Sequence, residues 1–234
     1  MALITVSAYD INYLFPLYIY PDEEQSNPKS AGAGTVMMVF DTREPYGKKP
    51  NIAPIIFEQL HTAFGKRPTP EKILYYIYGV FYSNVYRETY AEFLKIDFPR
   101  VPFTADYGLF KKIGKMGKAL ADLHLLKDRA VDPPVAKFPV VSGTDRIEKI
   151  IYKEKEQRVY INKDRYFARV TPEVWNYHIG GYQVLHKYLK DRKGRIMDDS
   201  QRYCKIITAL SKTIKIQKKL DEIYPKVEHE LINF

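Results

Sequence analysis

Residues 175–195 hold the densest group of side chains that could bind a ligand. The stretch reads WNYHIGGYQVLHKYLKDRKGR, and its last nine positions place five cations against one acid, Asp191. Lysine and arginine at this density suit the phosphate backbone of a nucleic acid. Gly180 and Gly181 should let the main chain approach a partner closely, at the opening of an amphipathic helix. The predicted phosphate contacts in this segment are Lys187, Arg192, Lys193 and Arg195.

Positive charge is concentrated in two parts of the chain. Positions 146–195 contain thirteen basic and six acidic residues, a difference of +7 within a whole-chain charge of +9. A second group, around Lys111 and Lys115, has no acid between positions 107 and 121, and we expect these two lysines to contact phosphates as well. Arginine grips guanine, and asparagine adenine, through paired hydrogen bonds. The predicted base-edge readers are therefore Arg146, Arg158, Asn162 and Arg165. For each cluster the alternative is a solvated basic face.

Composition limits the possible classes of protein. The chain has 234 residues, 45% of them hydrophobic, and a pI near 9.3, so a core can form and an acidic partner is favoured. Cys204 is the only cysteine, which excludes an internal disulfide and a multi-cysteine zinc site and fits a reducing cytoplasm. No apolar run approaches eighteen residues and no basic segment opens the chain, so we expect neither a membrane span nor a signal peptide. We expect no metal site.

Two motifs resemble parts of catalytic signatures but depart from the pattern, and a third signature is absent. Residues 132–135 read Asp-Pro-Pro-Val, whereas N6-adenine methyltransferases need an aromatic ring in the last place to stack on a flipped base. The glycines at 32–34 precede an apolar strand, expected at 35–40, instead of opening a helix. No Glu-x-Lys triplet of a metal-dependent nuclease occurs in the chain. We therefore predict a chain that is not an enzyme by itself.

Two stretches of this sequence resemble a known family. Residues 75–102 (YYIYGVFYSNVYRETYAEFLKIDFPRVP) and residues 175–195 resemble, in the same order, parts of the C-terminal specificity region of type ISP restriction-modification enzymes. These are large bacterial proteins that join a nuclease, a helicase-like motor, an N6-adenine methyltransferase and a target-recognition domain. The resemblance spans about residues 50–225. It implies double-stranded DNA as the partner, with the methyltransferase and helicase-nuclease domains upstream in the same polypeptide. S-adenosylmethionine, ATP and Mg²⁺ would belong to that parent enzyme, and no cofactor to this chain.

The elements that must position these residues follow from caps and periodicity. Asn51 could cap a helix reaching position 64 and closed by Gly65. Thr69-Pro70 starts a second helix, and Ser83 or Asn84 caps a third that reaches about position 94. Further helices are expected at 109–127, after Gly181, and from 198–200 onward. Short strands are expected at 147–152, 158–161 and 166–170, with a hairpin turn at 162–164.

These elements predict an α+β fold that is mainly helical with a small antiparallel β subdomain. The expected division is an extended segment at 1–50, a helical subdomain at 51–131 and a DNA-recognition subdomain of β-hairpin and helices at 132–234. The favoured function is a sequence-specific DNA target-recognition domain without chemistry of its own. Two other classes stay open at this point: a small basic nuclease or methyltransferase fragment with unrecognised motifs, and a helical protein-interaction domain with solubilising lysines.

Overall fold

The computed structural model describes residues 2–3, 14–20, 47–127, 129–139 and 142–234. The chain separates into two compact units, 1–74 with residue 234 and 75–233, so the boundary falls inside helix α2 (Pro70–Tyr82). The glycine turn at 32–34 and the strand expected at 35–40 lie outside the described residues. The three-part division expected from the sequence stays a prediction.

The described residues of the first unit form short antiparallel strands and one complete helix. Strand β1 (Ala2–Leu3) pairs with β2 (Leu14–Phe15), and β3 (Tyr18–Ile19) pairs with β4 (Lys49–Pro50). Helix α1 (Pro54–Phe64) ends at Gly65, whose φ of +66° is left-handed, as predicted. The predicted cap was wrong: α1 starts at Pro54, a favoured first helical residue, and the Asn51 side chain instead donates to the Pro16 carbonyl at 3.0 Å.

The helix starts at Pro70 and after Ser83 are confirmed. Helix α2 begins at Pro70, and Ser83 caps α3 (Asn84–Thr89) by accepting a hydrogen bond from the Tyr86 amide at 3.4 Å. Helix α3 is shorter than expected, because the chain leaves it after Thr89 and resumes as a 3₁₀ turn, η2 (Phe93–Lys95). The Ser83 cap also has a distant partner, since its hydroxyl donates to the carboxylate of Asp221 at 2.9 Å.

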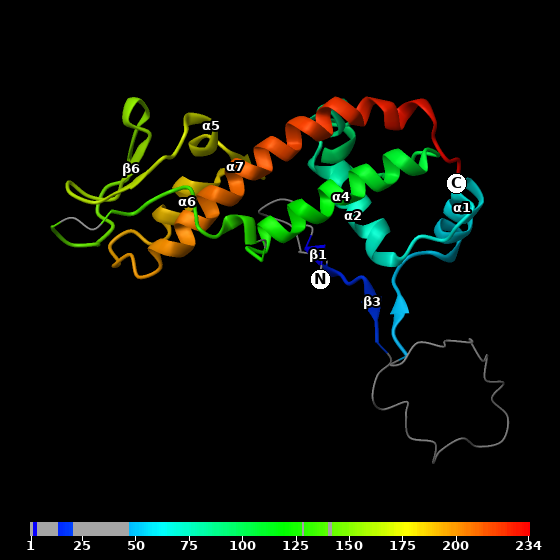
Figure 1. Ribbon diagram of the computed structural model, residues 1–234, viewed down its shortest axis with the longest axis horizontal. Helices are drawn as coiled ribbons and strands as arrows, with labels where there is room; N and C mark the ends of the chain where they lie inside the picture. Colours follow the sequence, from blue (N-terminus) through cyan, green and yellow to red (C-terminus); the bar gives the residue numbers. More distant parts are fainter. Residues whose placement is uncertain (1, 4–13, 21–46, 128, 140–141) are drawn as a thin grey trace, which may run out of the picture. The chain divides into compact units, whose positions relative to one another are not determined.

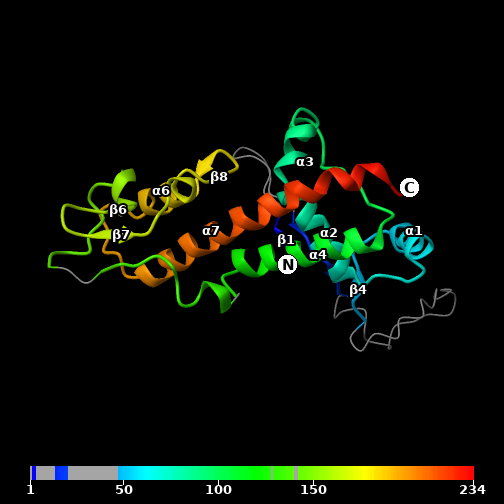
Figure 2. The same ribbon diagram turned by 45° about the horizontal axis from the view of Figure 1, so that its top comes forward.

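Two long helices form the frame of the second unit. Helix α4 (Tyr107–His124) is capped by Asp106, and α7 (Ser200–Ile223) by Asp199, whose side chain accepts from the Arg202 amide at 3.0 Å. The two helices pack along each other (Figures 1 and 2). They run antiparallel: Thr104 pairs with Leu231 at one end, and Leu123 shares a buried cluster with Ala209 toward the other. The 3₁₀ turns η3 (Arg129–Val131) and η5 (Tyr224–His229) follow α4 and α7 respectively.

Helix α4 also crosses α2 at a very close backbone contact. A Cβ atom added to Gly117 would lie 1.8 Å from the Tyr75 carbonyl oxygen and 2.7 Å from the Gly79 amide nitrogen. Only glycine fits at this crossing. Packing thus explains the glycine at position 117: a glycine lowers the intrinsic helix propensity of α4 there, but it allows a closer approach to α2.

The small β subdomain is an antiparallel sheet of three strands. These are β5 (Ile151–Lys153), β6 (Arg158–Tyr160) and β7 (Tyr166–Ala168), with the 3₁₀ turn η4 (Glu154–Glu156) joining the first two. The hairpin turn predicted at 162–164 is confirmed, because Asn162 Oδ1 accepts from the amides of Asp164 and Arg165 at 2.9 and 2.7 Å. This bonding is an Asx turn, which explains why an asparagine stands there.

The segment after the sheet differs from the prediction. Helix α5 (Pro172–Trp175) leads into a tight hairpin of β8 (His178–Ile179) and β9 (Tyr182–Gln183), and α6 (Val184–Lys190) starts only afterwards. Gly180 and Gly181 form the two-residue turn, with φ of +54° and +80°. Positive φ at both turn positions is what such a hairpin requires. The glycines therefore make a turn and do not open a helix.

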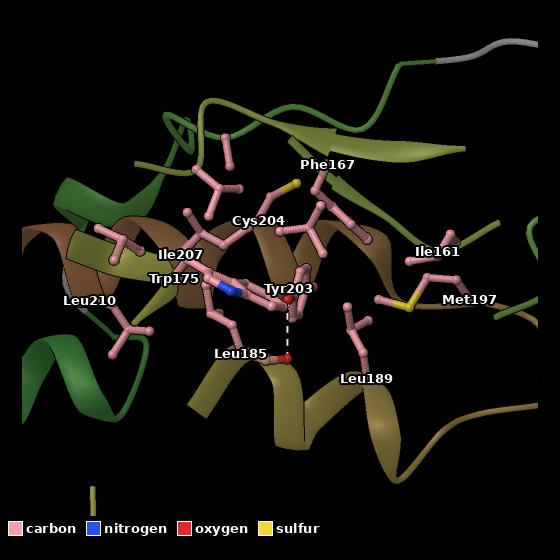
Figure 3. Packing of buried hydrophobic residues seen from close by; sticks show 14 of the residues in the cluster. Ile161, Phe167, Trp175, Leu185, Leu189, Met197, Tyr203, Cys204, Ile207 and Leu210 are labelled. Carbon is pink, nitrogen blue, oxygen red and sulfur yellow. Dashed lines mark hydrogen bonds between the residues drawn. The ribbon is translucent and has the colours of Figure 1, made fainter. Parts of the chain in front are cut away.

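The sheet, α5 and α6 pack on the N-terminal half of α7 around one hydrophobic core. Figure 3 shows Phe167 from the sheet, Trp175 from α5 and Leu185 and Leu189 from α6 surrounding Tyr203. The ring of Tyr203 is fully buried, and its hydroxyl donates to the Leu185 carbonyl at 3.1 Å. Burial raises the pKa of Tyr203 well above its usual value. Helix α7 therefore belongs both to the two-helix frame and to the core of the β subdomain.

The predicted fold class is confirmed: the protein is α+β and mainly helical, with small antiparallel sheets. Within the part of the chain that the structure describes, no helix has both the length and the apolar character needed to cross a membrane.

Candidate nucleic-acid interface

The basic segment after α6 is fixed to a second part of the backbone. The amide of Gly194 donates to the Ile147 carbonyl at 2.7 Å, and the amide of Ile147 donates to the Arg195 carbonyl at 2.9 Å. Met197 N donates to Asp145 O at 2.9 Å. Residues 194–197 therefore form a short antiparallel ladder with residues 145–147, and Gly194 provides the positive φ of +84° that the bend needs.

This ladder brings together basic residues that are distant in the sequence. Arg146 lies beside the segment, and its Nη1 donates to the Gly194 carbonyl at 2.9 Å. Arg202, in the first turn of α7, lines the same surface hollow as Arg192 and Arg195. It was missed from the sequence, where it is one of several cations on a long helix. We call the group Arg146, Arg192, Lys193, Arg195 and Arg202 the arginine surface.

The members of the arginine surface differ in how firmly the fold holds their side chains. The Arg192 guanidinium stacks 3.7 Å from the centre of the Tyr188 ring and donates to the Tyr188 carbonyl at 3.0 Å. Lys193, Arg195 and Arg202 have no side-chain partner among the described residues. Unpaired cations on a rigid backbone are available to an anionic ligand.

Lys187 is less available than the sequence suggested. Its Nζ lies 2.6 and 2.7 Å from the two carboxylate oxygens of Asp191, one helical turn away. The pair is about half exposed, so it is worth little to stability. It nevertheless cancels much of the local charge of α6, so a phosphate would have to compete with Asp191 for this lysine.

A cleft opens between the basic segment and the start of α7. Its volume is about 830 Å³, and Arg192, Arg195 and Arg202 line it together with Tyr188, Asp198 and Asp199. Asp199 is engaged in capping α7, whereas Asp198 is exposed and its carboxylate has no partner among the residues described. The cleft, named here the arginine cleft, offers donors and an acceptor side by side.

The predicted base readers of the β subdomain divide into two kinds. Arg158 lies on the outward face of the sheet, with its guanidinium 4.3 Å from the centre of the Tyr166 ring and Nη1 3.3 Å from Glu156 Oε2. Because the hydrogen bond to the Tyr160 hydroxyl and, to a smaller extent, the nearby Tyr166 and Glu156 favour the cation, the pKa of Arg158 is raised. This arginine is accessible from solvent, and its role as a base reader stays a prediction.

Asn162 and Arg165 instead have structural surroundings. Asn162 is 7% exposed, and its Nδ2 donates to the carbonyls of Thr144 and Arg146 at 2.7 and 2.9 Å. Arg165 is 5% exposed, forms an ion pair with Asp145 and donates to the Pro139 carbonyl at 2.9 Å. In this conformation neither side chain faces solvent, and together they hold the 144–147 loop on which the arginine surface depends.

Lys111 and Lys115 are not brought to the arginine surface. Both are exposed on α4, near the C-terminal half of α7, and Lys111 Nζ lies 4.7 Å from the centre of the Tyr107 ring. Helix α7 has 24 residues, which makes it about 36 Å long, and Arg202 lies at its opposite end. The two predicted clusters would therefore contact different parts of an extended ligand.

The surroundings of the Asp-Pro-Pro-Val segment are those of a junction. Asp132 Oδ2 lies 3.1 Å from Lys205 Nζ on α7, and the Val135 amide donates to Thr208 Oγ1 at 2.9 Å. Among the described residues, no three His, Cys, Asp or Glu side chains are grouped so that they could hold a metal ion.

Comparison with protein families gives one match over most of the chain. The family model described as "Type ISP C-terminal specificity domain" matches residues 2–220. The comparison with curated proteins gives no match.

Solved structures show the same fold. The chain is similar to the ATP-dependent Type ISP restriction-modification enzyme LlaBIII bound to DNA, with a TM-score of 0.60 and 21% identity over 88% of this chain and 13% of that one. A nuclease-deletion mutant of the Type ISP enzyme LlaGI with a DNA substrate mimic gives a TM-score of 0.52 and 20% identity over 74% of this chain and 14% of that one. The DrdV–DNA complex gives a TM-score of 0.58 and 17% identity over 75% of this chain and 20% of that one. This chain thus spans a fifth or less of each neighbour.

Proposed function

Because this chain belongs to the family of Type ISP C-terminal specificity domains, we propose that it recognises a target site on double-stranded DNA for a restriction-modification enzyme. The family match over residues 2–220 carries this proposal. The similar solved structures with DNA support it, as does the whole-chain charge of +9.

The arginine surface is the proposed main contact with the DNA backbone. Arg192, Lys193 and Arg195 would contact phosphates, with Arg146 and Arg158 nearer the base edges. Lys187 would join after leaving Asp191, and Lys111 and Lys115 would contact a more distant part of the duplex. Phosphate contacts fix the register of a protein on DNA, and base contacts specify the sequence. The buried Asn162 and Arg165 would act indirectly, by holding the loop that carries Arg146.

The chain would have no chemistry of its own. We propose that it works in the cytoplasm, joined to methyltransferase and helicase-nuclease domains upstream in the same polypeptide, and that S-adenosylmethionine, ATP and Mg²⁺ bind those parts. Its Asp-Pro-Pro segment lacks the stacking ring, and Asp132 pairs with Lys205. We expect calorimetry to detect no S-adenosylmethionine binding at micromolar strength. A micromolar dissociation constant would contradict this part of the proposal.

The salt dependence of DNA binding tests the contact surface. Each phosphate contact contributes about 0.9 to the slope of log affinity against log salt concentration. The triple variant Arg192→Ala/Lys193→Ala/Arg195→Ala should therefore flatten the slope by two to three units if all three residues touch phosphates. It should weaken binding to all duplexes similarly, because phosphates carry no direct sequence information. Fluorescence anisotropy at several salt concentrations gives both quantities.

A charge-matched variant controls for the loss of three cations. Lys215→Ala/Lys219→Ala/Lys226→Ala removes the same charge from exposed positions on α7 and η5, at the other end of the frame from the arginine surface. It should change the slope less than the first variant does. If the first variant is folded and binds with unchanged affinity and slope, the arginine surface is only solvated and the site is wrongly placed.

A further inference from the structure

The arginine cleft contains more than a phosphate site needs. Arg195 and Arg202 line it without side-chain partners among the described residues, but so does Asp198, with its carboxylate equally unpaired. Asp199 adds a second carboxylate, which caps α7. A carboxylate beside a phosphate is repelled, so two acids in the lining oppose a purely anionic ligand. The mixture suits a ligand that presents hydrogen-bond acceptors and donors next to each other.

We propose that the arginine cleft reads one G·C base pair of the DNA target, with Arg202 as the guanine reader and Asp198 as the cytosine reader. This inference rests on the proposed function and deepens it. In the major groove guanine presents two acceptors, O6 and N7, which match the fork of an arginine. The cytosine paired with that guanine presents its N4 amino group, which donates a hydrogen bond to a carboxylate. An unpaired arginine and an unpaired aspartate four positions apart provide both halves of that pattern.

The fold gives these two residues the rigidity that base reading requires. Arg202 lies in the first turn of α7, and its amide is bonded to the Asp199 cap. The next residue, Tyr203, is fully buried in the core. Asp198 directly follows Met197, whose amide bonds to Asp145 O at 2.9 Å and whose side chain is buried. Both readers therefore project from a backbone that is held on either side.

The rest of the arginine surface would flank this reading pair. Arg192 is held by its stacking on Tyr188, and it lines the cleft. Lys193 is exposed on the preceding loop without a partner among the described residues. These cations are placed to hold phosphates on the strand beside the pair. The two roles are then separate. Arg192 and Lys193 position the duplex through its phosphates, and Arg202 and Asp198 distinguish a G·C pair from the other base pairs.

Selection from a pool of randomised duplexes by the full 234-residue chain tests the proposal, with a substitution that keeps the charge. Arg202→Lys retains a cation but loses the fork, so discrimination at one G·C pair should fall by about 5- to 150-fold, the range for one bidentate contact. Asp198→Asn should relax preference at the same pair. Lys215→Gln, at an exposed position on the same helix, should leave the selected motif unchanged. Both reader positions are exposed, and melting curves confirm that each variant is folded.

Each outcome decides the matter. Loss of preference at a single shared G·C pair in both variants supports the proposal. An unchanged motif in either variant, loss of preference at two different pairs, or equal weakening at every position overturns it. Each of these leaves the proposed function standing, because the wild-type chain still selects a motif. If the wild-type chain binds no duplex, or selects no motif, the base-reading pair and the proposed function both fail.

Discussion

Replacing Asp221 with alanine should destabilise the second unit by about 2–4 kcal/mol. The Asp221 carboxylate, near the end of α7, accepts four hydrogen bonds from the start of α3: from Ser83 Oγ at 2.9 Å, Asn84 N at 2.7 Å, Asn84 Nδ2 at 2.8 Å and Val85 N at 3.3 Å. Two of these donors are the first amides of α3, which have no partner within their own helix. One side chain on α7 therefore acts as a cap for another helix.

The magnitude follows from what the substitution leaves unpaired. Loss of a helix cap costs about 0.5–2 kcal/mol, and a buried donor left without an acceptor costs about 1–3 kcal/mol. The Ser83 residue is fully buried, so its hydroxyl loses its acceptor away from water. Water can reach part of the Asn84 side chain, which is only partly buried. The expected loss of unfolding free energy is therefore smaller than the sum for four independent charged hydrogen bonds, and we estimate it at about 2–4 kcal/mol.

Urea unfolding followed by circular dichroism measures this loss. Asp221→Asn keeps one acceptor oxygen and should cost less than Asp221→Ala. Glu222→Ala, one position further along α7 and exposed, should change the free energy of unfolding by no more than about 0.5 kcal/mol. A loss below 1 kcal/mol for Asp221→Ala would refute the reasoning, since it would mean that α3 does not depend on α7 for its cap.

Two further predictions concern packing and pH. Gly117→Ala should lower the free energy of unfolding by about 1–3 kcal/mol, because its Cβ would lie 1.8 Å from the Tyr75 carbonyl oxygen; a stabilised variant in thermal melts would show that helix propensity outweighs the close contact. Burial lowers the pKa of His124 to about 4, and its ring nitrogens lie 2.8 Å from Tyr78 Oη and 2.9 Å from Thr213 Oγ1. The unfolded chain then binds a proton that the folded chain does not, so this contribution is present above about pH 6.5 and declines toward pH 4, by up to about 1.4 kcal/mol per unit. Urea unfolding between pH 7 and 4.5 should show a weaker decline in His124→Gln than in the wild type, and equal slopes would contradict the assignment.

The parts of the fold that were predictable depend on neighbours in sequence. Thr69-Pro70 and Ser83 mark helix starts through bonds to residues a few positions away, and the Asn162 turn is equally local. Asn51 carries the same kind of signal, yet its side chain bonds to Pro16, a partner that no local pattern reveals. Gly180 and Gly181 are compatible with either a close approach or a turn, and only the pairing of His178 with Gln183 decides.

The candidate site was harder to predict, because availability depends on distant partners. In the sequence Arg165 cannot be distinguished from the other arginines. In the structure it is buried, and its side chain is already bonded to Asp145 and to the Pro139 carbonyl. Arg202 was missed because the sequence shows it as one cation among many on a long helix. A usable signal did exist: the cap at 198–200 places Arg202 in the first helical turn, where a helix end can face a groove.

The ladder between residues 145–147 and 194–197 has a consequence for the thermodynamics of binding. A basic loop that became ordered only on contact with DNA would lose conformational entropy in its backbone, about 1–2 kcal/mol for each residue. Here Gly194, Arg195 and Met197 are already bonded to Asp145 and Ile147, so mainly the side chains of the arginine surface remain to be ordered, at about 0.5–1.5 kcal/mol each. Binding should then proceed without the large heat-capacity change of coupled folding.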